Sequence, residues 1–252
     1  MFIDTHCHLT DGYCDGVNNN DIIKRAMDAG VGVMICPTAN PDDIPTALGL
    51  ANAHNNVFCT IGIHPEYAPQ AVENILTDDI LDNPRVVGIG EIGLDYHYGA
   101  HNRNAQIEMF TQQLEIAKKH NLPVAIHTRD AEDDTAHILN TDVHGVMHCY
   151  TSSWNLAKTM LDRGFFFSAS GILTFRNAAD VRDTFAKIPL NRIVIETDAP
   201  YCAPVPYRGK VCEPMMVVET ARVLAQIKNI PIEELEIILA ENVKALYPKI
   251  KL

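Results

Sequence analysis

The sequence predicts an α/β fold, a single-domain (β/α)8 TIM barrel over residues 1–252, and three observations support this prediction. The chain has 252 residues, which is a usual length for such a barrel. Short apolar runs rich in Val, Ile and Phe alternate with longer stretches that have helical spacing. No linker-like tract, low-complexity segment or solenoid repeat divides the chain, so we expect one domain.

Eight apolar runs are the predicted strands, because several are bounded by Gly, Pro or Asn, as buried parallel strands often are. They cover residues 1–5, 31–36, 57–63, 86–92, 123–127, 145–149, 165–169 and 192–196. Alternation with helices favours a barrel over an open, doubly wound sheet. The open sheet more usually has a Gly-rich phosphate loop after its first strand, where this chain reads DTHCH over residues 4–8.

The stretches between these runs carry apolar residues at steps of three and four, which is the spacing of one helix face. The clearest case consists of Ile107, Phe110, Leu114 and Ala117. Two further helical patterns, over residues 213–228 and 232–247, would complete the outer ring of a barrel.

Composition and charge limit the possible classes of function. With 47% hydrophobic and 21% charged residues, the chain can bury a sizeable core. No apolar run reaches the ~18 residues of a membrane span, and the N-terminus lacks a signal-peptide pattern, so we expect a cytoplasmic protein. Nothing in the sequence indicates an obligate protein partner, and we expect a monomer. The net charge of −12 disfavours a protein that coats nucleic acid, although bound divalent cations can invert the local sign in a pocket.

The seven cysteines are an odd number and form no CxxC pair, which argues against a disulfide framework or a zinc finger. Cys36 and Cys59 lie inside apolar runs and are expected in the core. Cys7 and Cys149 neighbour polar residues that are candidates for a site. Because side chains alternate along a strand, we expect both thiols to face away from that site.

Polar residues that can ligate a metal stand at the carboxyl ends of the predicted strands, where barrels place their active sites. They are His6, His8, His127, His148, Glu91 and Asp198, with His64 at the end of a further strand. Imidazoles and carboxylates bind divalent metals, and six ligands suit two ions better than one open catalytic ion. Glu91 lies on a central strand and is our candidate for a carboxylate that bridges the two ions.

Hydrolysis is the natural chemistry of such a centre. Two ions would lower the pKa of bound water, and Asp198 would orient that water or take its proton. The serines form no GxSxG turn, and no cysteine has a histidine-paired motif that would offer a competing nucleophile. Arg129 follows the fifth strand, and Arg208 lies in a proline-rich loop after the eighth, so both are candidates for contacts with phosphate.

Six segments, taken in order along the chain, resemble the signature segments of the TatD family of metal-dependent deoxyribonucleases, within the amidohydrolase-like superfamily. They are IDTHCHL at 3–9, GIHP at 62–65, GEIGLDY at 90–96, IHTRDA at 126–131, HCY at 148–150 and ETDAPY at 196–201. The chain departs from the family pattern at Cys212, where Asn is common, and at Thr151-Ser152, where Ser-Gly is common. These departures concern substrate preference more than hydrolysis.

The resemblance implies a TIM-barrel hydrolase that acts on DNA, often as a 3′–5′ exonuclease that prefers single strands. It implies one ion held by His6, His8, Glu91 and Asp198, and a second held by Glu91, His127 and His148. It also implies that His64 contacts phosphate or bound solvent. Glu91, His64 and Asp198 are then the expected catalytic residues, and His64, Arg129, Tyr201 and Arg208 the expected substrate-binding residues.

Two other classes of function remain open from the sequence. The superfamily contains hydrolases and deaminases of small molecules, many of which bridge their metals with a carboxylated lysine, whereas here Glu91 offers an unmodified carboxylate. A binding protein with a silent site should have lost ligands, yet all six are present. The histidines favour Zn²⁺, Mn²⁺ or Co²⁺, while the family is usually discussed as Mg²⁺-dependent, so the identity of the two divalent ions stays open.

Overall fold

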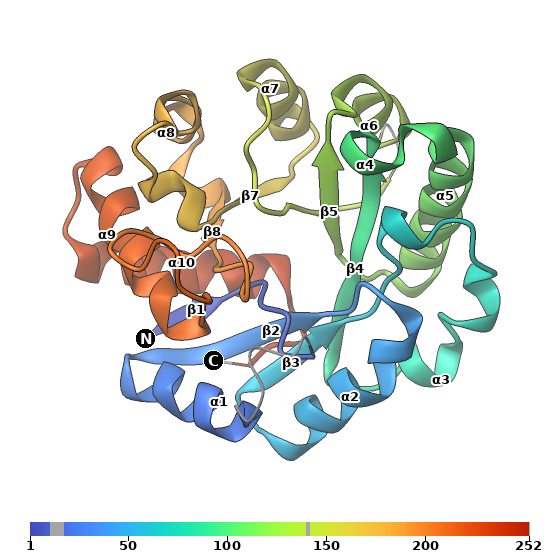
Figure 1. The fold of residues 1–252 in the computed structure, drawn as a ribbon, viewed down its shortest axis with the longest axis horizontal. Helices are drawn as coiled ribbons and strands as arrows, with labels where there is room; N and C mark the ends of the chain where they lie inside the picture. Colours follow the sequence, from blue (N-terminus) through green and yellow to red (C-terminus); the bar gives the residue numbers. More distant parts are fainter. Residues whose placement is uncertain (11–17, 140–141, 252) are drawn as a thin grey trace.

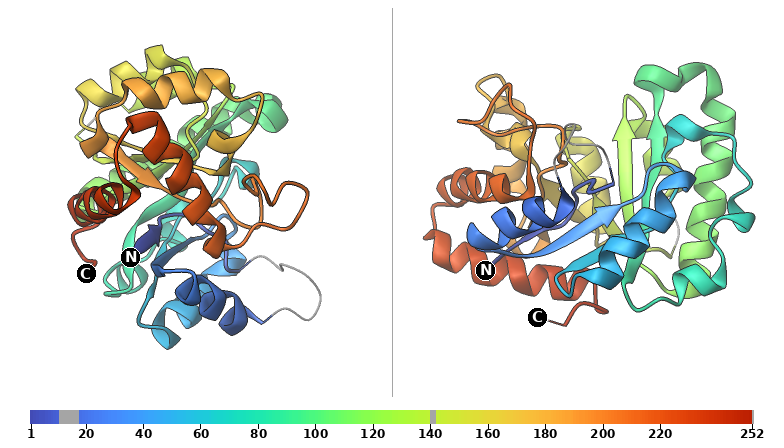
Figure 2. Two further views of the ribbon diagram at one scale, coloured as in Figure 1. Left: turned by 90° about the vertical axis from the view of Figure 1, so that its left-hand side faces the viewer. Right: turned by 60° about the horizontal axis from the view of Figure 1, so that its bottom comes forward.

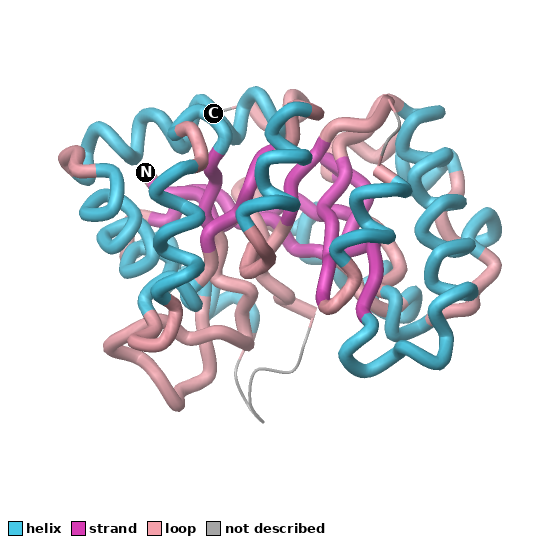
Figure 3. Tube along the Cα trace, turned by 90° about the horizontal axis from the view of Figure 1, so that it is seen from above, coloured by secondary structure: helices cyan, strands magenta, loops and turns pink. Residues whose placement is uncertain are grey.

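A computed structural model describes residues 1–10, 18–139 and 142–251, and it shows eight strands surrounded by helices (Figures 1 and 3). The strands are β1 (Phe2–Asp4), β2 (Val31–Pro37), β3 (Val57–Thr60), β4 (Val86–Asp95), β5 (Val124–Arg129), β6 (Gly145–Met147), β7 (Phe166–Ala169) and β8 (Ile193–Ile195). Each strand pairs in parallel with the next in the order β1 to β8. The predicted (β/α)8 fold is confirmed.

Helices fill the connections between strands and follow the last strand. They are α1 (Asn19–Asp28), α2 (Ile44–Ala53), α3 (Asp78–Leu81), α4 (Tyr96–Gly99), α5 (Arg103–His120), α6 (Glu132–Ile138), α7 (Trp154–Asp162), α8 (Ala179–Lys187), α9 (Val217–Lys228) and α10 (Ile232–Leu246). Short 3-10 helices include η2 (Pro65–Tyr67), η5 (Gly171–Thr174) and η7 (Pro214–Met216). Within the described ranges, no helix is long and apolar enough to cross a membrane.

Backbone hydrogen bonds across the seam between β8 and β1 bring the first and last strands together. The Thr5 amide donates to the Ile195 carbonyl at 3.1 Å, and the His8 amide donates to the Ala199 carbonyl at 2.7 Å. The Asp198 amide donates to the His6 carbonyl at 2.9 Å. Three of the predicted metal ligands therefore lie on this seam, although their positions in the chain are far apart.

The core consists of two apolar layers. The smaller cluster takes residues from every strand and from α10, including Val33, Phe58, Val194 and the fully buried Tyr247 just after α10. The larger cluster lies between the strands and the surrounding helices. Because α10 packs beside β1 and β8 (Figure 2), it covers apolar residues of the strands and leaves the polar carboxyl ends open.

Several strands end at residues other than the predicted ones, because their pairing with a neighbouring strand continues further or stops earlier. β4 extends to Asp95 instead of residue 92, because it stays paired with β5 through Gly93 opposite His127 and Asp95 opposite Arg129. The first and sixth strands end earlier than predicted, so His6 and His148 lie just after strands. The predicted helix at 213–228 begins with η7, and its α-helical part, α9, starts at Val217.

Candidate metal centre

The predicted ligands meet at the carboxyl end of the barrel, in and beneath a pocket of about 570 Å³. Residues that line this pocket include His8, His64, Glu91, Asp95, Tyr98, His127, Arg129, His148, Cys149, Asp198, Tyr201 and Cys202. His6 lies beneath them and is 2% exposed, which shields its imidazole from solvent. The structure therefore brings together all six residues predicted as metal ligands, together with His64.

Glu91 lies at the centre of this group, and its two carboxylate oxygens face different histidines. Oε2 is 3.3 Å from Nε2 of His6 and 3.4 Å from Nε2 of His8. Oε1 is 2.8 Å from Nδ1 of His127 and 2.9 Å from Nε2 of His148. This division matches the two ligand sets implied by the family resemblance, with one oxygen in each set.

Glu91 is ionised in this setting. Burial alone would raise the pKa of its carboxyl, but the surrounding imidazoles, above all His148, hold that pKa well below its usual range. A buried carboxylate that contacts this many imidazole nitrogens is suited to bridge two cations, since each of its oxygens keeps lone pairs for a ligand bond.

Asp198 completes the set that contains His6 and His8. Its Oδ1 lies 3.8 Å from Nε2 of His6 and 3.6 Å from Nε2 of His8, and those two nitrogens are 3.3 Å apart. Ligand atoms about 2.1 Å from a tetrahedral ion are roughly 3.4 Å from one another. The donor atoms therefore have the chemistry and the spacing that a divalent metal requires.

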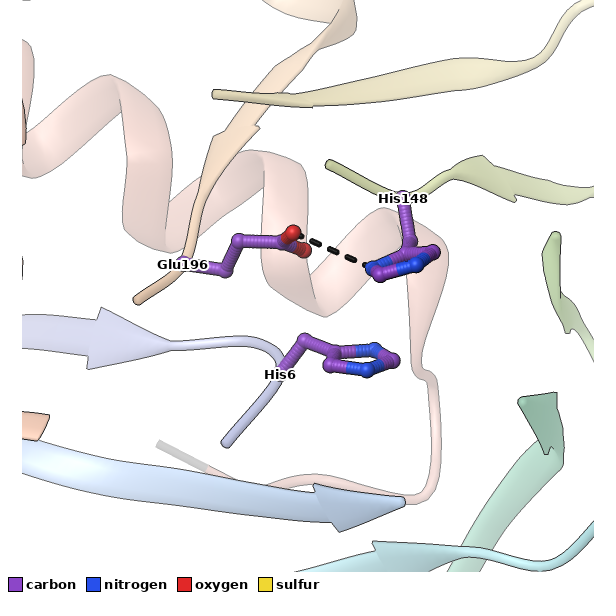
Figure 4. A group of neighbouring side chains, drawn as sticks. All are labelled: His6, His148 and Glu196. Carbon is purple, nitrogen blue, oxygen red and sulfur yellow. Dashed lines mark hydrogen bonds and ion pairs between the residues drawn. The ribbon is translucent and has the colours of Figure 1, made fainter. Parts of the chain in front are cut away.

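Two further carboxylates orient the histidines of the second set. Oε1 of Glu196 lies 3.2 Å from Nδ1 of His148 (Figure 4), and Oδ2 of Asp95 lies 3.2 Å from Nε2 of His127. The ring of His6 also stacks on that of His148, with 4.0 Å between their centres. Each carboxylate engages one ring nitrogen, so the other nitrogen faces Glu91 and is available as a ligand.

These two orienting roles were not predicted from the sequence. Asp95 lies four residues after Glu91 in β4, and side chains an even number of residues apart point to the same face of a strand. A strand predicted to continue past residue 92 would therefore have placed both carboxyls on one face. Glu196 directly follows β8 and is 1% exposed, but no local pattern showed that its partner is His148.

Buried glutamines of α5 fix the backbone near Asp95 and His64. The side chain of Gln106 accepts a hydrogen bond from the Asp95 amide and donates one to the Asp95 carbonyl, both at 2.9 Å. Gln113 binds the amide and carbonyl of Ile63 in the same way, at 2.8 and 3.0 Å. The pocket's edge is therefore attached to a packed helix.

His64 faces the centre as a neutral hydrogen-bond donor. Its Nδ1 accepts a hydrogen bond from the Glu66 amide at 3.2 Å, which leaves the ring proton on Nε2. That Nε2 lies 3.6 Å from Oε1 of Glu91. Burial lowers the pKa of His64 to about 3, so the ring is uncharged at neutral pH. This tautomer suits a contact with an oxygen of substrate or solvent better than ligation of a metal.

The predicted substrate-binding residues divide into two groups. Arg129 and Tyr201 line the pocket, and Arg129 lies over the ring of Tyr98 at 4.9 Å. Arg208 instead lies over the ring of Phe175 at 3.7 Å and is not among the described residues that line the pocket. Arg208 is therefore separated from the other candidate substrate-binding residues, and its guanidinium stacks on the ring of Phe175, a contact that was not predicted from the sequence.

One prediction about the cysteines is wrong. Cys7 is buried, with its thiol 3.6 Å from the Ile35 carbonyl, as alternation predicts. Cys149, however, lines the pocket, because β6 ends at Met147 and the backbone at Cys149 has a φ of 41°. Alternation applies only within a strand, so it could not describe a residue in this left-handed conformation.

Comparisons with known proteins agree with this architecture. The family model described as TatD related DNase matches residues 3–248. The chain is 36% identical to YcfH, an uncharacterized metal-dependent hydrolase of Escherichia coli K12, with 98% of this chain and 96% of that protein covered. It is 35% identical to YabD, an uncharacterized metal-dependent hydrolase of Bacillus subtilis 168, with 98% and 99% covered. The crystal structure of YJJV, a TatD homolog from Escherichia coli K12, superposes with a TM-score of 0.86 at 28% identity, covering 98% of both chains.

Proposed function

This chain belongs to the TatD related DNase family of metal-dependent hydrolases, and from that premise we propose that it hydrolyses phosphodiester bonds of single-stranded DNA in the 3′–5′ direction. We further propose that the reaction takes place at a binuclear metal centre. The observation that carries the proposal is the division of the Glu91 oxygens between two sets of histidines.

In this proposal one ion would be held by His6, His8, Asp198 and Glu91. The second would be held by His127, His148 and Glu91. When bound, two such ions would neutralise charge on the scissile phosphate and lower the pKa of water. Donors rich in imidazole favour Mn²⁺ or Zn²⁺ over Mg²⁺, and any of the three is compatible with the carboxylates.

Asp198 is the proposed general base. Burial alone would raise its pKa, but the hydrogen bond from His8 and the neighbouring imidazoles lower it, so the side chain is a carboxylate at neutral pH. Its Oδ1 faces His6 and His8, while Oδ2 lies 3.6 Å from the Cys202 thiol. Oδ2 is therefore the atom proposed to orient the attacking water and to take its proton.

His64 and Arg129 are proposed to bind the phosphate. The Nε2–H of His64 would donate to a non-bridging oxygen, and its pKa of about 3 keeps it from competing as a base. Arg129 lines the same pocket and supplies a positive charge, and its guanidinium stacks on the ring of Tyr98. With a net charge of −12, the outer faces of the protein add little affinity for DNA, so binding depends on these pocket contacts.

The aromatic residues of the pocket support a single-stranded substrate. Tyr98 is 74% exposed and Tyr201 is 57% exposed, so each ring has exposed surface on which an unpaired base could stack. A pocket of about 570 Å³ has the volume of a small-molecule site, which suits the terminal nucleotide of a strand more than a duplex. This feature favours removal of nucleotides from an end.

All the proposed ligands come from one chain, so we propose that the enzyme acts as a monomer. None of the six described cysteines forms a disulfide, which fits the reducing environment of the cytoplasm, where we place the protein.

The direct test is hydrolysis of single-stranded oligonucleotides labelled at the 3′ or the 5′ end, with Mg²⁺, Mn²⁺ or a chelator. We expect metal-dependent loss of the 3′ label first, and no cleavage by Asp198→Asn, which retains the size of the side chain. A duplex of the same sequence should be cleaved more slowly.

The result that contradicts the proposal is absence of cleavage by protein shown to carry two ions per chain. It would favour the alternative of a hydrolase or deaminase of small molecules. Retention of fewer than one divalent ion per chain would contradict the binuclear centre itself, and a near-normal rate in Asp198→Asn would remove Asp198 from the mechanism.

A further inference from the structure

A second type of ligand group adjoins the histidine centre. The thiols of Cys149 and Cys202 and the carboxylate of Asp198 place their ligand atoms within 4.8 Å of one another. The thiol of Cys202 lies 3.6 Å from Oδ2 of Asp198. Both cysteines line the pocket that contains the histidines. The two thiols and the carboxylate thus form a compact S, S, O set with access to solvent.

Local backbone geometry turns these three side chains toward one another. Cys149, Asp198 and Cys202 all adopt positive φ, at 41°, 57° and 53°. The Cys149 amide donates to Oε1 of Glu196 at 2.7 Å, which ties it to the buried carboxylate that orients His148. The thiols therefore come from ordered backbone at the edge of the candidate metal centre.

The loop that carries Cys202 is attached to η5. A side chain at Gly171 would have its Cβ only 2.0 Å from the Cys202 carbonyl oxygen, so the two backbones are in direct contact. Thr174 accepts a hydrogen bond from the Val205 amide at 2.8 Å. These contacts hold Cys202 next to Cys149.

We propose that Cys149, Cys202 and Asp198 form a further binding site, which shares Asp198 with the histidine centre, for one thiophilic divalent cation, such as Zn²⁺ or Cd²⁺. Thiolates select such ions over Mg²⁺ and Mn²⁺. Sulfur ligands about 2.3 Å from a tetrahedral Zn²⁺ lie roughly 3.8 Å apart, so small side-chain rotations suffice to bring the three ligand atoms around an ion. On binding, the two thiol protons pass to solvent.

Because Asp198 belongs to both sets of ligands, a cation at the thiol site would inhibit the enzyme. It would occupy Oδ2, the atom proposed to take the proton of the attacking water. The existence of the site is independent of DNA hydrolysis, whereas this inhibitory effect rests on the proposed function.

The site can be tested by titrating the metal-free protein with Cd²⁺ under a non-thiol reductant and recording the ultraviolet charge-transfer band of cadmium thiolate. Cd²⁺ bound only by histidines and carboxylates gives no such band. We expect saturation at one thiolate-bound Cd²⁺ per chain. Cys202→Ser and Cys149→Ser should each weaken the band at least about twofold, while Cys59→Ala, which removes a thiol buried in β3, should leave it unchanged.

Absence of the band in the wild-type protein would overturn the proposal, as would an unchanged band in Cys202→Ser. A mass two hydrogens lower after reduction, with Cys149 and Cys202 linked, would also overturn it, because a disulfide leaves no thiolates to bind an ion. If Cys149→Ser fails to fold, Cys202→Ser still tests the site, because the serine hydroxyl can donate a hydrogen bond to Asp198 in place of the thiol.

The inhibitory effect is tested in the oligonucleotide assay with Mn²⁺. Added Cd²⁺ should inhibit Cys202→Ser at a concentration at least about tenfold higher than it inhibits the wild type, as expected for loss of one ligand worth about 1.4 kcal/mol. Equal sensitivity would refute inhibition through this site. A cadmium thiolate band in a protein that does not cleave DNA would support the thiol site and contradict the proposed function. Failure of the thiol site and failure of the proposed function are therefore distinguishable.

Discussion

Gly93 provides the sharpest test of how β4 and β5 position the candidate metal centre. It lies opposite His127 in the strand register, and its φ is 144°, in a region that favours glycine. A Cβ at this position would lie 1.9 Å from the His127 carbonyl oxygen, whereas real Cβ atoms essentially never come within 3.0 Å of another heavy atom. Gly93→Ala must therefore push β4 and β5 apart by on the order of 1 Å.

The cost follows from two sources. Overpacking a buried position costs about 1–3 kcal/mol, and a side chain held in an unfavourable backbone region costs a further ~1–3 kcal/mol. We therefore expect Gly93→Ala to lower the free energy of unfolding by about 2–6 kcal/mol. Since His127 and Asp95 lie on the displaced strands, the variant should also bind Mn²⁺ more weakly.

Gly49 is the matched control. It is exposed in the interior of α2, and a Cβ there would meet no heavy atom within 4 Å. The same substitution, Gly49→Ala, should raise the free energy of unfolding by about 0.5–1 kcal/mol, because alanine favours the helix and restricts the unfolded chain.

Thermal and urea unfolding of the three proteins, with chelator and with Mn²⁺, measures both effects. For a chain of this size 1 kcal/mol corresponds to about 2–4 °C in Tm. A Gly93→Ala protein whose stability lies within about 1 kcal/mol of the wild type would refute the argument from backbone contact. So would two alanine variants that change stability in the same direction.

Three further predictions concern the site. Glu196→Gln removes the carboxylate that accepts a hydrogen bond from His148, so Mn²⁺ should bind about 10–100-fold more weakly, as measured by calorimetry. An unchanged affinity for Mn²⁺ would mean that Glu196 does not orient His148 for metal binding. Arg129→Ala should raise the KM for oligonucleotide about tenfold through loss of a charged hydrogen bond, while Arg208→Ala should change it less than about twofold; the reverse order would place Arg208 on the substrate. Burial alone would lower the pKa of His8, but hydrogen bonds to carboxylates raise it from 6.5 to about 10 in the metal-free protein. This raised pKa adds stability below about pH 6.5 that is lost toward pH 10. The Tm of chelator-treated protein should therefore fall as the pH rises across that range, and it should fall less in His8→Gln. An equal dependence of Tm on pH in the two proteins would contradict the raised pKa of His8.

The fold and the clustering of the candidate metal ligands could be predicted from the sequence because both depend on short-range patterns. Apolar runs, several of them bounded by Gly, Pro or Asn, marked the strands, and polar residues such as His127 and Asp198 stood at or just after the ends of those runs. In a parallel barrel all carboxyl ends of strands meet on one face. Ligands that are far apart in the chain, such as His6 and His148, were therefore predictable as neighbours without knowledge of the packing.

The orienting carboxylates and the positions of Arg208 and Cys149 could not be predicted in the same way, because they depend on local backbone geometry and on contacts between segments. Glu196 acts through a hydrogen bond to a histidine on another strand end. Arg208 is kept from the pocket by stacking on Phe175, and Cys149 enters it through a positive φ. Neither a ring contact nor a backbone torsion leaves a periodic signal in the sequence.

The seam between β1 and β8 shows how closure of the barrel sets the spacing of the first ligand set. The buried carboxyl of Asp4 accepts hydrogen bonds from the amide and the hydroxyl of Thr197, at 2.9 and 2.5 Å. Thr197 directly precedes Asp198, and Asp4 lies two residues before His6, so this pair fixes both ligands relative to each other. The 3.8 Å between Asp198 Oδ1 and His6 Nε2 thus depends on two side chains, those of Asp4 and Thr197, that are outside both candidate ligand sets. Changes at Asp4 should accordingly disturb metal binding through the position of Asp198, even though Asp4 itself lies outside the pocket.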